Sequence, residues 1–189
     1  MTTDEELIVK IKGGDDTAFR ELMSRHIKHV FNFVLQYVHV REEAEDVTQD
    51  TFFKTWKNIG RFKDSMKFKP WLFTIARNTA YDFIKKKKAI PFSGMNGDND
   101  DDFDFTETLS DMEPLPSEIF ARKELADEVD EILKILHPDH RAILLMHYRE
   151  EMTFEEISKI IKKPMNTVKS WHRRSLIRIK DGLMHQKSQ

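Results

Sequence analysis

Apolar residues recur every three or four positions along most of this chain, which is the spacing of helices buried along one side. A short helix is expected to end at Gly13 and Gly14, and a longer one to follow with Asp16 as its N-cap. A further helix is expected from Glu42. Its predicted inward residues are Ala44, Val47, Phe52, Trp56 and Ile59. The pattern therefore predicts an all-α protein.

Residues 61–88 interleave aromatic rings with lysine and arginine. Pro70 suits the first turn of a helix, and Asn78 is expected to break or cap that helix before another begins. Some of the rings must belong to a core. Rings exposed beside cations, however, can stack on unpaired bases while the cations neutralise the backbone. The hypothesis for this stretch is binding of single-stranded DNA.

Residues 153–180 form two helical patterns around one interruption. Thr153 and Glu156 have the spacing of a capping box, and Pro164 ends the first pattern. The second helix, from about Met165, is expected to turn inward Val168, His172, Ser175 and Ile179, and outward Asn166, Thr167, Lys169, Ser170, Arg173 and Arg174. Such a pair suits a helix-turn-helix that reads a major groove, although basic helical hairpins also occur in ordinary bundles.

Two helical domains are predicted on either side of an irregular stretch. Residues 90–117 are rich in glycine, proline, serine and acids without a helical period, which is typical of a flexible linker. Periodicity returns at Glu118, and Pro138 is expected to open a further helix. We therefore expect two small helical domains, residues 1–89 and 118–189, joined by an acidic linker.

Charge is segregated along the chain although the net charge is only −2. Residues 61–88 contain nine lysines or arginines against two acids, and residues 153–180 contain eight against two. Residues 93–118 contain nine acids and no base. The two basic blocks suggest two surfaces that meet a polyanion, the alternative being ordinary solvated surface.

Composition narrows the function classes. The chain has no cysteine, which excludes disulfides and thiolate zinc sites, and it has neither a signal peptide pattern nor an apolar run of membrane length. A cytoplasmic protein is expected. The His26/His29 and His137/His140 pairs lack the glutamate and spacing of a zinc hydrolase. We expect no metal and no cofactor, and a metallohydrolase is an alternative that elemental analysis of the purified protein can remove.

The outer face of the helix from Glu42 carries acidic and amide groups beside an aromatic ring. These residues are Asp46, Gln49, Asp50 and Phe53. Such a face suits a basic protein partner better than DNA. An ordinary solvated helix face is the alternative.

Three segments together resemble the extracytoplasmic-function sigma factors, the small two-domain class of the bacterial sigma-70 superfamily. They are AEDVTQDTFFKTW (44–56), WLFTIARNTAYDFIKKKK (71–88) and LHPDHRAILLMHYREEMTFEEISKIIKKPMNTVKSWHRR (136–174). The resemblance covers nearly the whole chain and implies a transcription initiation factor that is not an enzyme. Its implied partners are core RNA polymerase, promoter DNA and an anti-sigma factor, without insertion of this chain into a membrane.

The resemblance also assigns roles to residues. Domain 1–89 is implied to bind the polymerase clamp through Asp46, Gln49, Asp50 and Phe53. The same domain is implied to capture the melted minus-ten strand, with Asn78 in a loop that receives a flipped base. The implied minus-ten residues are Trp71, Arg77, Asn78, Lys85, Lys86 and Lys87. Domain 118–189 is implied to read the minus-thirty-five duplex. Its implied residues are Asn166, Thr167, Lys169, Ser170, Trp171, Arg173 and Arg174.

The recognition helix departs from the family pattern. Members usually carry glycine near Lys162, arginine at Trp171, an aliphatic residue at His172 and alanine at Ser175. Trp171 can contact a thymine methyl or a sugar, or it can turn inward, which we expect because histidine is a poor core residue at the next position. A helix-turn-helix regulator that binds duplex operators without joining polymerase is the alternative function.

Overall fold

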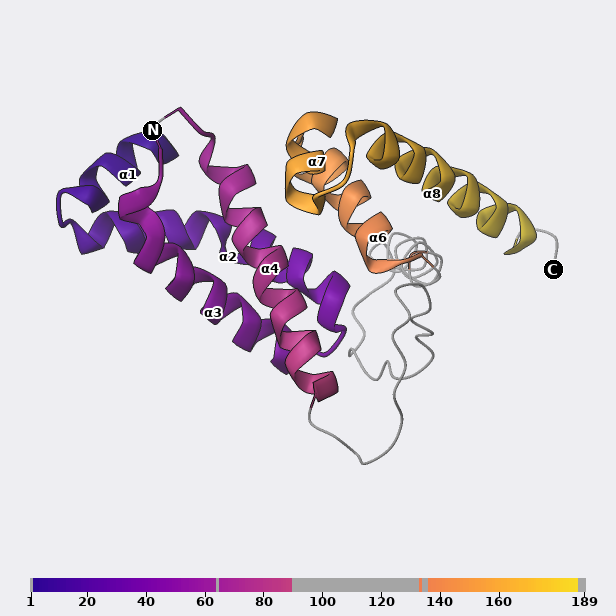
Figure 1. The fold of residues 1–189 in the computed structure, drawn as a ribbon, viewed down its shortest axis with the longest axis horizontal. Coiled ribbons are helices and arrows are strands. Elements are labelled where there is room, and N and C mark those ends of the chain that lie inside the picture. The colour runs from indigo at the N-terminus through magenta and orange to yellow at the C-terminus, as the bar shows by residue number, and fades with distance from the viewer. Residues whose placement is uncertain (1, 64, 90–132, 134–135, 187–189) are drawn as a thin grey trace, which may run out of the picture.

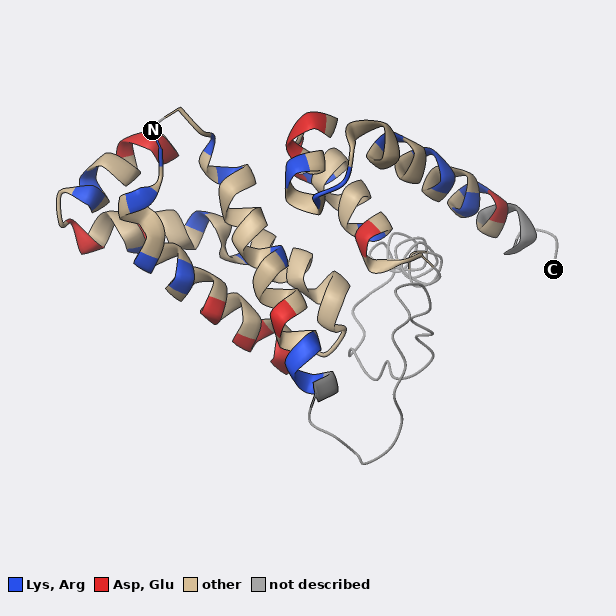
Figure 2. Ribbon diagram, in the orientation of Figure 1, with Lys and Arg blue, Asp and Glu red and all other residues tan. Residues whose placement is uncertain are grey.

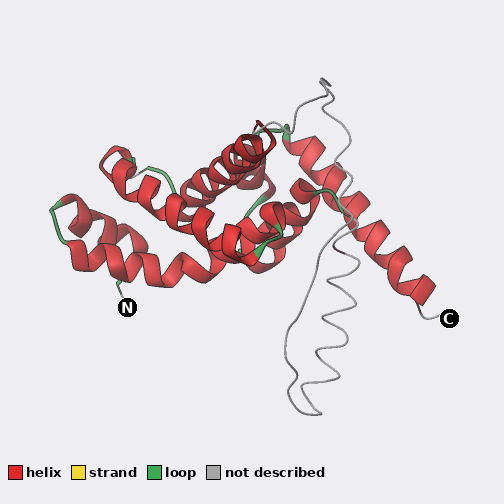
Figure 3. Cartoon of the chain, turned by 90° about the horizontal axis from the view of Figure 1, so that it is seen from below, coloured by secondary structure: helices red, strands yellow, loops and turns green. Residues whose placement is uncertain are grey.

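The computed structural model describes residues 2–63, 65–89, 133 and 136–186. The expected linker at 90–117, and most of the helix expected from Glu118, lie outside these residues. Within the described ranges the chain forms helices joined by short turns, and it contains no strand (Figure 3). The prediction of an all-α fold with two helical domains is confirmed.

The first domain is built from α1 (Asp4–Lys12), α2 (Asp16–Val38), α3 (Arg41–Asn58) and α4 (Phe68–Ala89), with the 3-10 turn η1 (Ile59–Arg61) between the last two (Figure 1). Thr3 and Glu6 form a capping box at the start of α1. Gly14 then adopts a φ of 92°, which a side chain would strain, and this lets the chain reverse into α2.

The N-cap of α2 is Asp15, one residue before the predicted position. Its Oδ1 accepts hydrogen bonds from the backbone amides of Thr17 at 2.9 Å and Ala18 at 3.2 Å. Asp16 is the first helical residue. Either aspartate could cap a helix on chemistry alone, so the geometry of the preceding turn decides between them.

The second domain contains α6 (Pro138–Leu144), the π-helical turn η2 (Leu145–Arg149), α7 (Phe154–Ile161) and α8 (Met165–Gln186). Pro138 opens α6, and the predicted capping box of Thr153 and Glu156 opens α7. Lys162 ends α7 in the left-handed conformation, with a φ of 57°. The C-terminal part of α8 extends away from the other helices in both ribbon views (Figures 1 and 3).

The predicted break at Asn78 is wrong, because α4 runs unbroken from Phe68 to Ala89 with Asn78 in its middle. Asparagine in a helix interior costs only about 0.7 kcal/mol relative to alanine. Burial of Leu72, Phe73 and Ala76 in the core outweighs that preference. Among the described residues, the nearest non-helical backbone precedes α4, at residues 62–63 and 65–67.

The inward position predicted for Trp56 is also wrong, since half of this side chain is exposed. Thr51 and Thr55 fill the buried stripe instead. The Thr51 hydroxyl donates to the Val47 carbonyl at 2.7 Å, and that of Thr55 to the Thr51 carbonyl at 2.8 Å. These bonds satisfy the hydroxyls within the helix, so threonine can occupy core positions.

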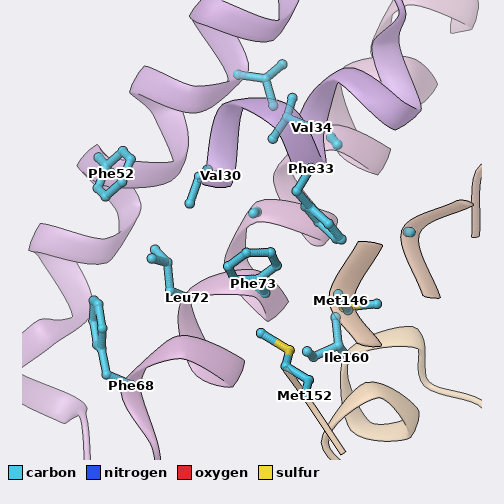
Figure 4. Close-up of a cluster of buried hydrophobic side chains, with 14 of the residues drawn as sticks. Val30, Phe33, Val34, Phe52, Phe68, Leu72, Phe73, Met146, Met152 and Ile160 are labelled. Carbon is cyan, nitrogen blue, oxygen red and sulfur yellow. The ribbon is translucent and has the colours of Figure 1, made fainter. Parts of the chain in front are cut away.

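The apolar cores of the two domains are continuous. Figure 4 shows Met146, Met152 and Ile160 of the second domain close to Phe33 and Phe73 of the first, and all five belong to one buried cluster. The helices in contact are α4 with α7 and α2 with α6. The second domain therefore packs directly on the first.

Candidate functional site

The outer face of α3 is open to solvent. Asp46, Gln49, Asp50 and Phe53 are all exposed, as the sequence pattern predicted. Phe53 is 55% exposed and its ring lies 6.4 Å from that of Trp56, one helical turn further on. These five residues are called the α3 surface below.

The α3 surface borders an open groove between α2 and α3, with a volume of about 500 Å³. Gln49, Phe53 and Trp56 form one wall, and Phe19, Met23 and Ile27 of α2 form the other. An apolar groove edged by carboxylates and an amide can bind an amphipathic helix that carries basic residues. Trp56 and the α2 wall were missed as site residues, although Gln49, Phe53 and Trp56 share one face by helical spacing.

The predicted single-strand residues on α4 lie in three different environments. Trp71 is half-buried, and its ring packs edge-on against Phe62 with a centroid distance of 5.2 Å. Asn78 is half-buried on the middle of the helix. Lys85, Lys86 and Lys87 are exposed at the C-terminal end, where Figure 2 shows basic residues of α4 beside acidic residues of α3. Lys87 pairs with Glu43 of α3 at 2.5 Å.

Arg77 is held at the junction of the two domains. Its guanidinium contacts Asp139 of α6 at 3.1 Å, with only 11% of the arginine side chain exposed. Burial by itself lowers the pKa of Arg77, but the charge and hydrogen bond of Asp139, together with Tyr37 and Tyr81, offset this and the pKa is raised. Burial, and then the Asp139 charge, raise the pKa of Tyr81 to about 12, so this phenol remains a donor.

The helix-turn-helix places most of its predicted contact residues outward. Asn166, Lys169, Arg173 and Arg174 are exposed, and Thr167 and Ser170 are half-buried beside them. Val168 and Ser175 are buried on the opposite side of α8. A helix with a polar and basic outer face and a packed inner face can enter a major groove.

Three of the unusual positions in α8 have structural explanations. The Trp171 ring turns inward and packs against His140 of α6, with centroids 4.9 Å apart. His172 donates or accepts a hydrogen bond with the Tyr148 hydroxyl at 3.1 Å and packs against His147 and Phe154. The Ser175 hydroxyl is buried and donates to the Trp171 carbonyl at 2.8 Å. Trp171 therefore takes the inward position expected from the sequence, half-buried against α6.

The paired histidines serve structural contacts. His26 binds Asp4 through Nε2, and His29 binds Glu150 through Nδ1 at 2.9 Å. No group of three or more histidine, aspartate or glutamate side chains within the described ranges is placed to hold a metal ion. Across the same ranges, no helix is long and apolar enough to cross a membrane.

Comparison with protein families finds two matches in chain order. Residues 22–90 match sigma-70 region 2, and residues 126–179 match sigma-70 region 4. The chain is 28% identical over 168 residues to the RNA polymerase sigma-H factor of Pseudomonas aeruginosa, covering 88% of this chain and 86% of that protein. It is 30% identical over 151 residues to the RNA polymerase sigma factor CarQ of Myxococcus xanthus, covering 80% of each.

A solved structure shares the fold over nearly the whole length. This is CnrH, in complex with the cytosolic domain of CnrY, with a TM-score of 0.67 and 21% identity. The match covers 96% of the present chain and 97% of CnrH. At this identity the likeness describes the arrangement of helices and assigns no residue a role.

Proposed function

The chain belongs to the sigma-70 family, in its extracytoplasmic-function class, and on this premise we propose that it is a transcription initiation factor which joins core RNA polymerase and directs it to promoters. The first domain binds the polymerase through the α3 surface and captures the melted minus-ten strand through α4 and the loop before it. The second domain reads the minus-thirty-five element as duplex. No bond is made or broken by the protein itself.

The observation that best supports this function is the exposed α3 surface with its adjoining groove. Asp46 and Asp50 give it negative charge, whereas a surface that binds DNA directly needs positive charge. Phe53 and Trp56 supply aromatic anchors of the kind that dominate binding between proteins. A regulator that only occupies operators has no use for such a surface.

DNA recognition is divided between two surfaces of different chemistry. Exposed lysines at the end of α4 neutralise phosphates, and the half-buried Trp71 near the start of α4 provides a ring for stacking once bases are unpaired. Capture of flipped bases draws the duplex toward the melted form, since unstacking costs only a few kcal/mol. The basic outer face of α8 anchors the upstream element as duplex.

Run-off transcription with purified core polymerase on a promoter library tests this function. The wild type is expected to give specific transcripts, and the double variant Gln49→Ala, Asp50→Ala to lose both transcripts and polymerase binding. The matched control is Glu21→Ala, which removes one exposed carboxylate from α2 outside the groove. If the double variant loses DNA binding but still binds polymerase, the assignment of the α3 surface is wrong.

A further inference from the structure

Three carboxylates of the second domain meet three cations of the first. Asp139 pairs with Arg77 at 3.1 Å, Glu150 with Lys69 at 2.7 Å and Glu156 with Lys67 at 2.8 Å. The acids follow one another in the order 139, 150 and 156, whereas their partners run 77, 69 and 67. The second domain therefore runs antiparallel along α4 and its preceding residue. Asp139, Glu150 and Glu156 are called the interdomain carboxylates below.

Asp139 is enclosed by donors from the first domain. Besides Arg77, the Tyr37 hydroxyl donates to its Oδ1 at 3.0 Å and the Tyr81 hydroxyl to its Oδ2 at 3.1 Å. The carboxylate is only 6% exposed. A buried carboxylate is costly unless charge and hydrogen bonds compensate it, and here α2 and α4 provide that compensation.

Glu150 shows the same dependence on the first domain. Its side chain is fully buried, and its contacts are Lys69 of α4 and His29 of α2, the latter at 2.9 Å. Lys69 also donates to the Glu150 backbone carbonyl at 3.2 Å. Removal of the first domain would leave this buried acid without Lys69 and His29, so its burial fits the packed arrangement of the two domains.

Glu156 adds a contact closer to the surface. Its Oε2 closes the capping box with Thr153, and its Oε1 binds Lys67. Lys67 is 74% exposed, so this pair is partly screened by water and contributes less than the two buried pairs. It nevertheless places a negative charge over the residues that lead into α4.

The three cations belong to the basic block that the proposed function assigns to single-stranded DNA. Lys69 and Arg77 are separated by eight residues, or about 12 Å along a helix. The same donors cannot bind carboxylates and phosphates at once. Lys85 and Lys86, more than two helical turns beyond Arg77, remain exposed. The carboxylates thus take the donors of the first part of α4 and leave its end open.

We propose that the second domain is an internal competitor for nucleic acid: the interdomain carboxylates hold it over α4 in the free protein, and capture of single-stranded DNA requires the two domains to separate. This inference rests on the proposed function. The apparent dissociation constant for DNA is the intrinsic one divided by the fraction of molecules that are open. Loosening the interface therefore strengthens DNA binding even though no residue that touches DNA is changed.

A purely structural interface makes the opposite prediction. Loss of buried partners would then lower the stability of the chain and leave its DNA affinity unchanged or weaker. The apolar contact of Met146 and Met152 with Phe33 and Phe73 supports the packed arrangement in either case. Variants of the carboxylates separate the two explanations, because they leave this contact and every cation of α4 in place.

The test is the affinity of the full-length chain for a fluorescein-labelled single-stranded 20-mer of mixed sequence, measured by fluorescence anisotropy. The double variant Asp139→Asn, Glu150→Gln is expected to bind roughly tenfold more tightly than the wild type. The control is Glu155→Gln, which removes a neighbouring exposed carboxylate that pairs with Lys159 within α7. Neutralising this carboxylate, or two exposed carboxylates elsewhere, is expected to shift the affinity for DNA far less than the double variant does. Tyr37→Phe, which changes no charge, is expected to tighten binding a few-fold.

Thermal unfolding and core polymerase binding are measured on the same samples. If the double variant and Tyr37→Phe both bind DNA no more tightly than Glu155→Gln, whatever their unfolding temperatures, the inference is overturned and the single-strand assignment stands. If every form binds core polymerase and none binds the oligonucleotide, the single-strand assignment itself is wrong, and the inference falls with it. Tighter DNA binding by the double variant and by Tyr37→Phe, with unchanged polymerase binding, supports both the inference and the single-strand assignment.

Discussion

The helices α3 and α4 are neighbours in one domain, yet their outward faces differ in accessibility. The α3 surface is open along its length, with Phe53 and Trp56 about half exposed. The first half of α4 is covered by the second domain, with Arg77 paired to Asp139. With the roles proposed above, the proposed polymerase site is available in the free protein while much of the proposed DNA site is not. Binding to polymerase can therefore come first.

The distribution of charge explains why the second domain covers α4 and leaves α3 free. The interdomain carboxylates are attracted by Lys67, Lys69 and Arg77. The outer face of α3 carries carboxylates of its own, which would repel them (Figure 2). The second domain thus packs on the face of opposite charge, and in our proposal DNA competes for that same face of α4.

The largest effect is expected from removing the aromatic anchors of the α3 surface. The double variant Phe53→Ala, Trp56→Ala should weaken core polymerase binding at least about a hundredfold, because anchors of this kind contribute about 2 kcal/mol or more each. Stability and affinity for single-stranded DNA should hardly change, since both side chains are half exposed and lie on the other helix. Titration of labelled protein with core polymerase measures the effect.

The matched control for this pair is Val9→Ala on α1, which truncates a side chain that is 64% exposed and does not line the groove. It should bind polymerase as the wild type does. An equal loss of polymerase and DNA binding in the double variant would show that the two helices do not have separate roles.

A smaller effect is expected at the uncovered end of α4. The double variant Lys85→Ala, Lys86→Ala should bind single-stranded DNA several-fold more weakly at low salt. Its plot of log affinity against log salt should be shallower by about 1.4, since each phosphate contact on a single strand contributes about 0.7 to the slope. The measurement is a set of anisotropy titrations at increasing salt.

Lys10→Ala with Lys28→Ala is the control for charge alone, because both lysines are exposed in the same domain on α1 and α2. This pair should leave the salt slope unchanged. Equal slopes for the two double variants would mean that the end of α4 makes no direct phosphate contact.

The smallest effect is a pH dependence of the interdomain contact. His39, at the end of α2, lies 2.9 Å from the Arg141 guanidinium of α6, and burial together with that positive charge lowers its pKa to about 4. When the domains separate, the pKa returns toward its ordinary value of about 6.5. The open form therefore takes up more protons between these values, and the closed form weakens as the pH falls through this window.

The variant His39→Asn isolates this effect. Asparagine can still accept from Arg141, and it tolerates the left-handed backbone at this position, where φ is 59°. Fluorescence energy transfer between labels on the two domains, at pH 7.5 and pH 5.5, should report opening of the wild type at the lower pH and less opening of the variant. Identical responses would exclude His39 as the cause.

Local features of the fold could be predicted from the sequence. The capping box of Thr153 and Glu156, the glycine stop at Gly14 and the opening of α6 by Pro138 each depend on residues within one helical turn. Such determinants act through nearby backbone groups and are visible in the sequence itself. The helix-turn-helix and the outer face of α3 followed from the same spacing.

The errors arose where tertiary packing outweighed local preference. Asn78 is compatible with a break, but the surrounding core residues keep α4 continuous. Trp56 fits an apolar stripe, but threonines with internally bonded hydroxyls take the buried positions. Neither result can be predicted from the helical period alone. The period shows which positions share a face, but it does not show whether a threonine or a tryptophan will be the buried residue.

The interdomain contacts lay beyond prediction for a different reason. Tyr37 and Asp139 are separated by 102 positions, and Arg77 and Asp139 by 62. No local pattern links them. The sequence indicated Arg77 only as an implied DNA contact, and it gave no role to Asp139. Their pairing is a property of the packed domains.

The most direct test of this account is the distance between the two domains in the free protein. The chain has no cysteine, so spin labels can be placed at Lys28→Cys on α2 and Ile177→Cys on α8, both of which are exposed. Pulsed electron paramagnetic resonance should give one narrow distance distribution for the otherwise unchanged chain, and a second, longer and broader one when Asp139→Asn and Glu150→Gln are added. A broad distribution that is the same with and without these two changes would contradict the account.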